Sequence, residues 1–142
     1  MLGTAIDAPL FHASIDFDMT FIVQPQGTFG EFRCGMMNDL TDTTPTDGIY
    51  FQRTSASGNW RAVTRSGGTE TDTDTTIAGT ANTWYRLRLL RNGSNIEFYI
   101  DGTLSATNTA NIPAGALNLG VQNKTTDYDV DFFRLRINNI SR

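Results

Sequence analysis

The sequence predicts an all-β protein that folds as an antiparallel two-sheet jelly-roll sandwich. Short runs of β-branched and aromatic residues alternate with clusters of Gly, Asn, Asp, Thr and Pro along all 142 residues. No window sustains the i, i+3, i+4, i+7 apolar spacing of an amphipathic helix, so no crossover helices are available for a parallel sheet. This length is enough for one core, and we expect a single domain over residues 1–142 that includes an N-terminal arm of about residues 1–13.

The first strands are marked by strict alternation. Apolar residues occupy every second position between Ile15 and Phe21 and therefore share the face that points into the core. Pro25 and Gly27 then turn the chain into a strand over 29–37, where Cys34 alternates in step with Phe and Met. Cys34 is thus expected to be a core residue with an inert thiol.

The middle of the chain reads as three further antiparallel strands. A polar loop over 38–47 leads to a strand at 48–53, and a second turn leads to another at 60–65. The stretch 67–79 alternates Thr with Asp, Glu and Gly, which is typical of an exposed edge strand protected by charge. We interpret this stretch as an edge strand whose charges prevent pairing with another copy of the protein, rather than as a binding site.

The segment from Trp84 to Gly102 predicts a β-hairpin. A turn at Asn92-Gly93 would pair Leu87 with Phe98 on the core face and Arg88 with Glu97 on the outer face. A four-residue loop over 92–95 keeps the same faces and changes only the register. Strands at 104–108, 117–121 and 128–137 complete about ten strands.

Composition excludes several functions. Eleven basic against fifteen acidic residues give a net charge of −4, which disfavours nucleic acid as a partner. No apolar run approaches the roughly 20 residues of a membrane helix. A single cysteine allows no intrachain disulfide, and the first residues do not resemble a secretory signal, so synthesis in a reducing cytoplasm is expected.

Three segments carry a resemblance to a known superfamily. They are Trp84 to Arg88, Ile96 to Gly102 with its Ile-Asp-Gly turn, and Asp129 to Leu135 with its Asp-Val-Asp-Phe-Phe run. In this order they resemble the concanavalin A-like lectin/glucanase superfamily, in particular the short type found in structural proteins of tailed phages. The likeness covers about residues 15–137.

The resemblance implies a jelly roll and favours a phage particle, and because the glucanase carboxylate pattern is missing we expect no enzymatic activity. Our leading hypothesis is a virion-surface structural protein of a tailed bacteriophage, made in the host cytoplasm, either a capsid decoration protein or a tail or fibre module. The alternative is a lectin-like carbohydrate-binding module that recognises a host surface glycan. Sandwiches of this kind serve both purposes, so the fold itself does not decide.

The acidic residues near the C-terminus are the candidates for catalysis or metal binding. Asp129 and Asp131 would lie roughly 6.6 Å apart on one strand face, a spacing that suits a glycosidase pair. However, the Glu-x-Asp-x-x-Glu pattern of the glucanase members is absent, and we expect ion pairs with Arg61, Arg65 or Arg134 instead. With Asp127 the same residues suit calcium, although a solvated strand start is the plainer interpretation, and no other cofactor is expected.

Outward-facing aromatic and polar residues are the candidates for glycan binding, because sugars stack on aromatic rings and bond to polar side chains. Tyr50 and Tyr99 fall on the parity opposite to the core residues of their strands, and one hypothesis is that they line a shared groove. A solvated cross-strand ladder is the plainer alternative. The other members of the predicted set are Gln52, Arg86, Arg88 and Glu97.

The apolar end of the N-terminal arm is the candidate assembly element. Pro9, Leu10 and Phe11 precede the first strand and have no partner in its hairpin pattern. They could dock on a neighbouring copy or virion protein, or on their own sandwich. Because one small domain offers modest interfaces, we expect a homotrimer or attachment to a symmetric scaffold.

Overall fold

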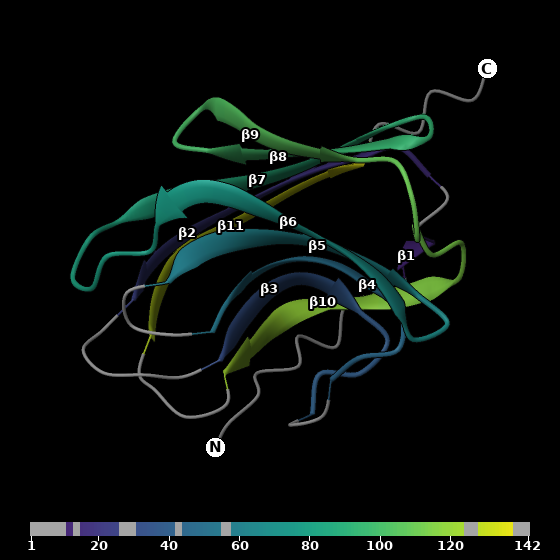
Figure 1. Cartoon of the computed structure of the whole chain (residues 1–142), viewed down its shortest axis with the longest axis horizontal. Coiled ribbons are helices and arrows are strands. Elements are labelled where there is room, and N and C mark those ends of the chain that lie inside the picture. The colour runs from purple at the N-terminus through teal and green to yellow at the C-terminus, as the bar shows by residue number, and fades with distance from the viewer. Residues whose placement is uncertain are drawn as a thin grey trace.

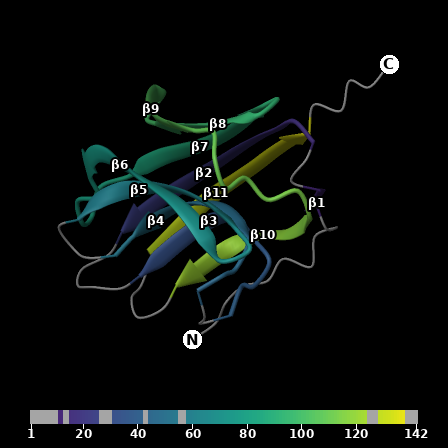
Figure 2. The same cartoon turned by 45° about the vertical axis from the view of Figure 1, so that its right-hand side comes forward.

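The computed structural model describes residues 11–12, 15–25, 31–41, 44–54, 58–123 and 128–137. Eleven strands form two antiparallel sheets that face each other, and the described residues include no helix (Figure 1). In both views β2, β7 and β11 lie behind β3, β4 and β5 (Figure 2). The predicted all-β, antiparallel two-sheet architecture is confirmed, with eleven strands in place of about ten.

The two sheets draw their strands from distant parts of the chain. The six-stranded sheet has the order β1 (Phe11–His12), β10 (Ala116–Asn123), β3 (Phe32–Met37), β4 (Gly48–Arg53), β5 (Asn59–Ser66) and β6 (Thr69–Ala78). The five-stranded sheet has the order β11 (Tyr128–Ile137), β2 (Phe17–Pro25), β7 (Tyr85–Asn92), β8 (Asn95–Ile100) and β9 (Thr103–Asn108).

The core lies between the sheets and is rich in aromatic rings. Along β2 every second residue is buried, as its alternating sequence predicts. Phe51 of one sheet meets Phe98 of the other edge to face, with ring centroids 5.2 Å apart, and Trp60 meets Tyr85 in the same way at 5.6 Å. Cys34 is fully buried in this core, where burial raises the pKa of its thiol, so the prediction of a core cysteine is confirmed.

The β7–β8 hairpin keeps the predicted faces but not the first predicted register. Its turn lies at Gly93 and Ser94, so Leu87 pairs with Ile100 and Leu89 pairs with Phe98. This register is shifted by two residues from that of an Asn92-Gly93 turn and agrees with that of a loop over 92–95. Because side chains alternate with a period of two, the shift leaves every residue on its predicted face.

The ends of the six-stranded sheet are formed by β6 and β1. β6 is an edge strand, as its alternating Thr and acidic residues predict. At the other edge, Phe11 and His12 pair with Leu117 and Ala116 of β10, so this end of the arm docks on its own sandwich. Pro9 and Leu10 lie outside the described residues. No described segment forms a helix that is long and apolar enough to cross a membrane.

Candidate ligand-binding face

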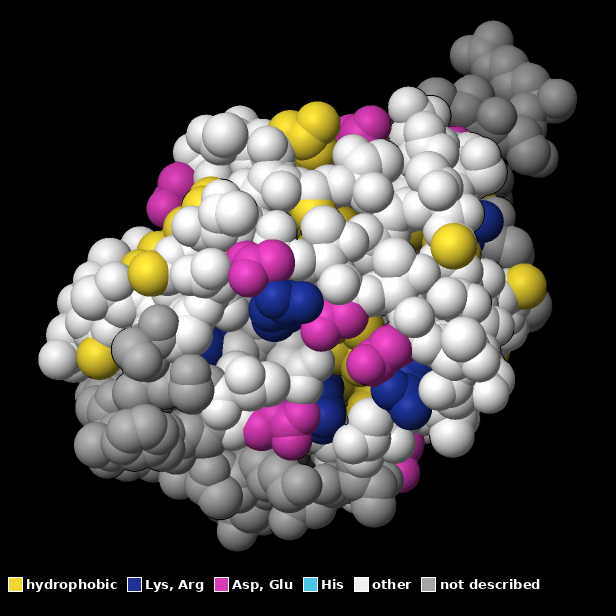
Figure 3. All heavy atoms as spheres, in the orientation of Figure 1, with side chains coloured by type: hydrophobic (Ala, Val, Ile, Leu, Met, Phe, Trp, Pro, Cys, Tyr) yellow, Lys and Arg dark blue, Asp and Glu magenta, His cyan; other side chains and the backbone are white. Residues whose placement is uncertain are grey.

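The outer face of the six-stranded sheet carries a row of polar side chains that crosses five strands. Strand register places Gln122, Arg33, Gln52, Arg61 and Asp74 directly beside one another on β10, β3, β4, β5 and β6. We call these five residues the polar row. Acidic and basic side chains alternate over this face in the space-filling view (Figure 3).

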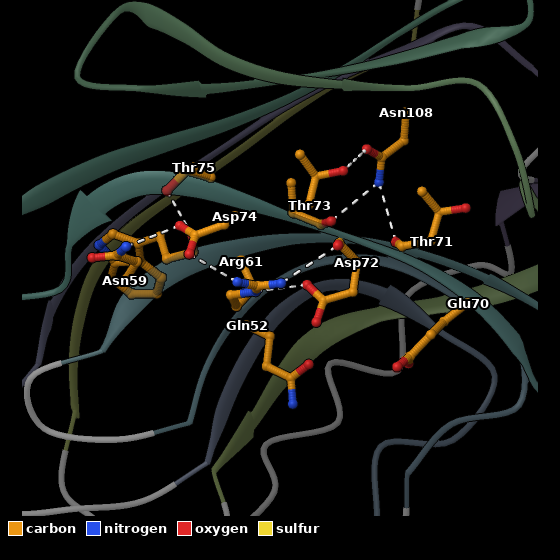
Figure 4. A network of polar contacts seen from close by, with 12 residues as sticks. Gln52, Asn59, Arg61, Glu70, Thr71, Asp72, Thr73, Asp74, Thr75 and Asn108 are labelled. Atoms are coloured by element: carbon orange, nitrogen blue, oxygen red, sulfur yellow. Dashed lines mark hydrogen bonds and ion pairs between the residues drawn. The ribbon is translucent and has the colours of Figure 1, made fainter.

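Arg61 is held at the centre of a hydrogen-bonded network (Figure 4). Its Nε donates to Asp72 Oδ1 at 2.8 Å, and its guanidinium lies 2.9 Å from Asp74 Oδ2. Asp74 Oδ1 also accepts from the side chain of Asn59 at 2.9 Å and from the backbone N–H of Thr76 at 2.7 Å. The hydrogen bond from the Thr76 N–H, followed by the smaller effect of the bond from Asn59, lowers the pKa of Asp74. The hydrogen bond to Asp72 raises the pKa of Arg61. Both charges therefore persist at neutral pH.

The other end of the polar row is fixed by Glu31. Its carboxylate pairs with Arg33, and the same oxygen accepts from Gln52 Nε2 at 2.5 Å. Arg33, which is buried, also bonds Gln122 across the sheet. These contacts set the orientation of Gln52, whose side chain is half-buried, before any ligand arrives.

The loop between β3 and β4 covers the part of this face that lies next to the polar row. Leu40 packs so closely over Gly120 that a Cβ atom added to this glycine would lie 2.8 Å from the Leu40 side chain. Leu40 also packs against a small buried cluster of Met37, Tyr50 and Val63. Asp47 ties the loop to the next turn, because its Oδ1 accepts from Gly67 N at 2.9 Å. Arg33 and Gln122 are buried, and Arg33 contacts Thr44 of this loop at 3.4 Å, so the exposed part of the polar row runs from Gln52 to Asp74.

The comparisons with known proteins identify the family. A model of the SO2946-like, C-terminal domain matches residues 4–131. The chain belongs to this family. No curated protein matches the sequence.

Solved structures show the fold of this SO2946-like domain. Galectin LEC-6 of Caenorhabditis elegans has 18% identity and a TM-score of 0.67, covering 95% of this chain and 92% of its own. Sheep galectin-11, solved with glycerol, has 11% identity and a TM-score of 0.62, covering 89% and 94%. The carbohydrate-binding module CBM66 of Bacillus subtilis has 13% identity and a TM-score of 0.57, covering 81% and 75%. These likenesses support the predicted jelly roll of the concanavalin A-like type, whereas the phage type stays a prediction.

The predicted glycan-binding set of the SO2946-like domain is divided between opposite faces. Gln52 lies on the outer face of the six-stranded sheet, whereas Arg86, Arg88, Glu97 and Tyr99 lie on the outer face of the five-stranded sheet. The outer faces of a sandwich point away from each other. The expectation of one groove shared by all of these residues is therefore wrong.

Tyr50 is not exposed as its parity predicts. Its side chain is fully buried beneath the β3–β4 loop, and the Arg33 guanidinium lies 5.8 Å from its ring centroid. Burial raises the pKa of Tyr50 to about 12. Parity places Tyr50 on the outer face correctly, but the loop that directly precedes β4 folds over it.

The outward-facing residues of the five-stranded sheet form a cross-strand ladder, which is the plainer alternative to the predicted glycan-binding groove. Arg88 makes two bonds to Asp18, at 2.7 and 2.9 Å, and its guanidinium lies 5.2 Å from the Tyr99 ring centroid. Tyr99 donates to Glu97 Oε2 at 2.6 Å, which raises the pKa of the phenol. Arg86 is exposed at the end of this ladder, where its backbone N–H donates to Asp101.

Sequence reasoning missed Arg61, Asp72 and Asp74 because it treated the stretch 67–79 only as an edge strand. The signal was present, since a turn at Gly67-Gly68 places Arg65 opposite Glu70 and Arg61 opposite Asp74. The arginines at 61 and 65 thus pair with β6. The side chains of Asp129, Asp131 and Arg134 lie outside what the structure describes, so an ion pair with Arg134 stays a prediction.

The predicted calcium residues are not assembled in the described part of the domain. Asp127 and the side chains of Asp129 and Asp131 lie outside what the structure describes. A β-bulge between Val130 and Phe132 interrupts the alternation that was expected to place the last two on one face. Among the described residues, no group of three or more His, Cys, Asp or Glu side chains suits a metal. Calcium binding stays a prediction.

Proposed function

We propose that this SO2946-like domain is a non-catalytic carbohydrate-binding module that holds glycan on the outer face of its six-stranded sheet. The polar row carries this proposal. Gln52, Arg61 and Asp74 stand side by side on adjacent strands, and all three are partly or fully exposed. Amide, guanidinium and carboxylate groups are the side chains that hydrogen-bond sugar hydroxyls.

The geometry of the polar row suits a short saccharide. Two strand spacings separate Gln52 from Asp74, a span of roughly 10 Å that matches a disaccharide lying across the strands. Arg61 is already fixed by Asp72 and Asp74, and Gln52 by Glu31. Binding therefore requires little further ordering of these side chains, which lowers its entropic cost.

The fold comparisons support this proposal over a structural role in a virion. The carbohydrate-binding module CBM66 shares the fold, although at 13% identity it speaks for the fold alone. The virion-surface hypothesis, a homotrimer and the assembly role of Pro9, Leu10 and Phe11 stay predictions.

A glycan array tests the proposal with variants on each face. We expect the wild-type domain to bind a defined set of glycans and Arg61→Ala to lose that binding. Arg88→Ala is the matched control, because it removes an arginine that is paired with an aspartate on the opposite face. Both variants should stay folded, since exposed ion pairs contribute at most about 1 kcal/mol.

Two outcomes would contradict the proposal. An array on which the wild-type domain binds no glycan removes carbohydrate binding as the function. Binding that survives Arg61→Ala but is lost in Arg88→Ala or Tyr99→Ala would place the site on the five-stranded sheet.

A further inference from the structure

Every arginine on the outer face of the six-stranded sheet is paired with a carboxylate in the described structure. Four such ion pairs join three arginines to four acids. The three arginines and four acids of these ion pairs carry a net formal charge of −1. The chain as a whole carries −4, so no excess of positive charge elsewhere offsets the sign of the face.

In each of these ion pairs the carboxylate is the more exposed partner. Glu31 exposes 23% of its side chain and its partner Arg33 exposes 2%. Asp72 and Asp74 expose 36% and 44%, whereas Arg61, which pairs with both, exposes 29%. Glu70 exposes 45% and its partner Arg65 exposes 20%. The carboxylates thus present the larger fraction of their side chains to solvent. A ligand that approaches this face therefore meets hydrogen-bond acceptors beside each guanidinium.

We infer that the ligand of this face is an uncharged, hydroxyl-rich glycan, and that the face excludes sugars carrying carboxylate or sulfate groups. The inference rests on the proposed function and names its ligand class. Hydroxyl groups donate to carboxylates such as Asp72 and Asp74, and such charge-assisted bonds are stronger than neutral ones. An acidic sugar would instead bring its charge against these carboxylates and find each guanidinium already neutralised.

Arg61 illustrates why an anion finds no binding partner here. Its Nε and one terminal nitrogen face Asp72, through a side-chain bond at 2.8 Å and a backbone contact at 3.4 Å. Its other terminal nitrogen faces Asp74 at 2.9 Å. Both edges of the guanidinium fork, which a sugar carboxylate or sulfate would use, already face the carboxylates of Asp72 and Asp74 and the backbone oxygen of Asp72.

The test compares glycans that differ only in charge. The array carries neutral oligosaccharides beside their sulfated and sialylated derivatives, and dextran beside dextran sulfate. We expect the wild-type domain to bind neutral parents at least about tenfold more tightly than their acidic derivatives. In the double variant Asp72→Asn, Asp74→Asn, freed Arg61 should shift the ratio of acidic to neutral binding upward by about tenfold or more.

The matched control is Asp18→Asn, which frees Arg88 on the opposite face. This control should leave the acidic-to-neutral ratio at the wild-type value. Wild-type binding to acidic derivatives that equals or exceeds binding to their neutral parents overturns the inference and leaves the proposed function standing. An unchanged ratio in the double variant also overturns the inference. Failure to bind any glycan overturns the proposed function and the inference with it.

Discussion

Thr73 donates a hydrogen bond from its Oγ1 to Oδ1 of Asn108, 2.8 Å away, across the edge where the two sheets meet. The amide nitrogen of Asn108 lies 3.1 Å from Ala62 O, 3.3 Å from Thr64 Oγ1 and 3.3 Å from Thr71 O. One side chain of β9 thus joins the edge of the five-stranded sheet to β5 and β6. These two strands carry Arg61 and its aspartates on their other side, so this amide supports the polar row from behind.

Asn108→Ala should therefore destabilise the domain. The substitution removes a buried amide and leaves Thr73 Oγ1 without the acceptor that Asn108 provides. Loss of such a buried polar partner costs about 1–3 kcal/mol of unfolding free energy. Urea denaturation measures the change. Asn118→Ala is the control, because Asn118 makes one exposed 3.4 Å contact and its loss should stay within about 0.5 kcal/mol. Equal effects of the two variants would show that Asn108 does not join the sheets energetically.

Phe98→Ala tests the assignment of faces on β8. Phe98 is fully buried and packs edge to face on Phe51, so its truncation should lower the unfolding free energy by about 3–5 kcal/mol. Glu97→Gln, one residue earlier on the outer face, should cost under about 1 kcal/mol. Thermal denaturation of both variants measures the contrast. A melting temperature for Phe98→Ala that matches the wild type would contradict the core described for this sandwich.

Tyr50→Phe tests the burial of Tyr50 beneath the β3–β4 loop. The Tyr50 hydroxyl is buried and makes no hydrogen bond within the described structure, so its removal at pH 7 should leave the domain equally stable or more stable.

At alkaline pH the variant should be clearly the more stable of the two. Burial raises the folded-state pKa of Tyr50 to about 12, whereas unfolded tyrosine titrates near pH 10. The phenol's contribution is therefore complete below about pH 10 and is lost as the pH rises through 12. Over this range the wild type should lose about 2–3 kcal/mol more than Tyr50→Phe. Denaturation at pH 8 and pH 11 measures about half of this loss, roughly 1.4 kcal/mol, because pH 11 lies midway between the two pKa values. Parallel losses in both proteins would show that the phenol is solvated.

The sequence predicts faces well because parity is a local property of a strand. Phe17, Met19 and Phe21 are buried as their alternation requires, and the β7–β8 hairpin keeps its faces despite a shift of register. Register depends on which residues form the turn, and the choice between turns near Gly93 involves small energies that a pattern does not reveal.

Which sheet a strand joins depends on distant parts of the chain, and what covers a strand depends on how the loops beside it fold. Gln52 and Tyr99 have the same outward parity, but β4 and β8 belong to different sheets, so the two residues lie on opposite sides of the molecule. Tyr50 is buried because the loop that carries Leu40 folds back over it. By contrast, the pairing of Arg61 with Asp74 follows from the neighbouring Gly67-Gly68 turn and was within reach of sequence reasoning.

The most direct test of the account is to map the bound glycan by NMR. The ¹⁵N-labelled domain is titrated with the neutral oligosaccharide that binds best on the array, and backbone amide shifts are followed residue by residue. The account predicts that the largest shifts fall on β4, β5 and β6, around Gln52, Arg61 and Asp74. Shifts centred on Arg88 and Tyr99, or no saturable shifts on either face, would contradict it.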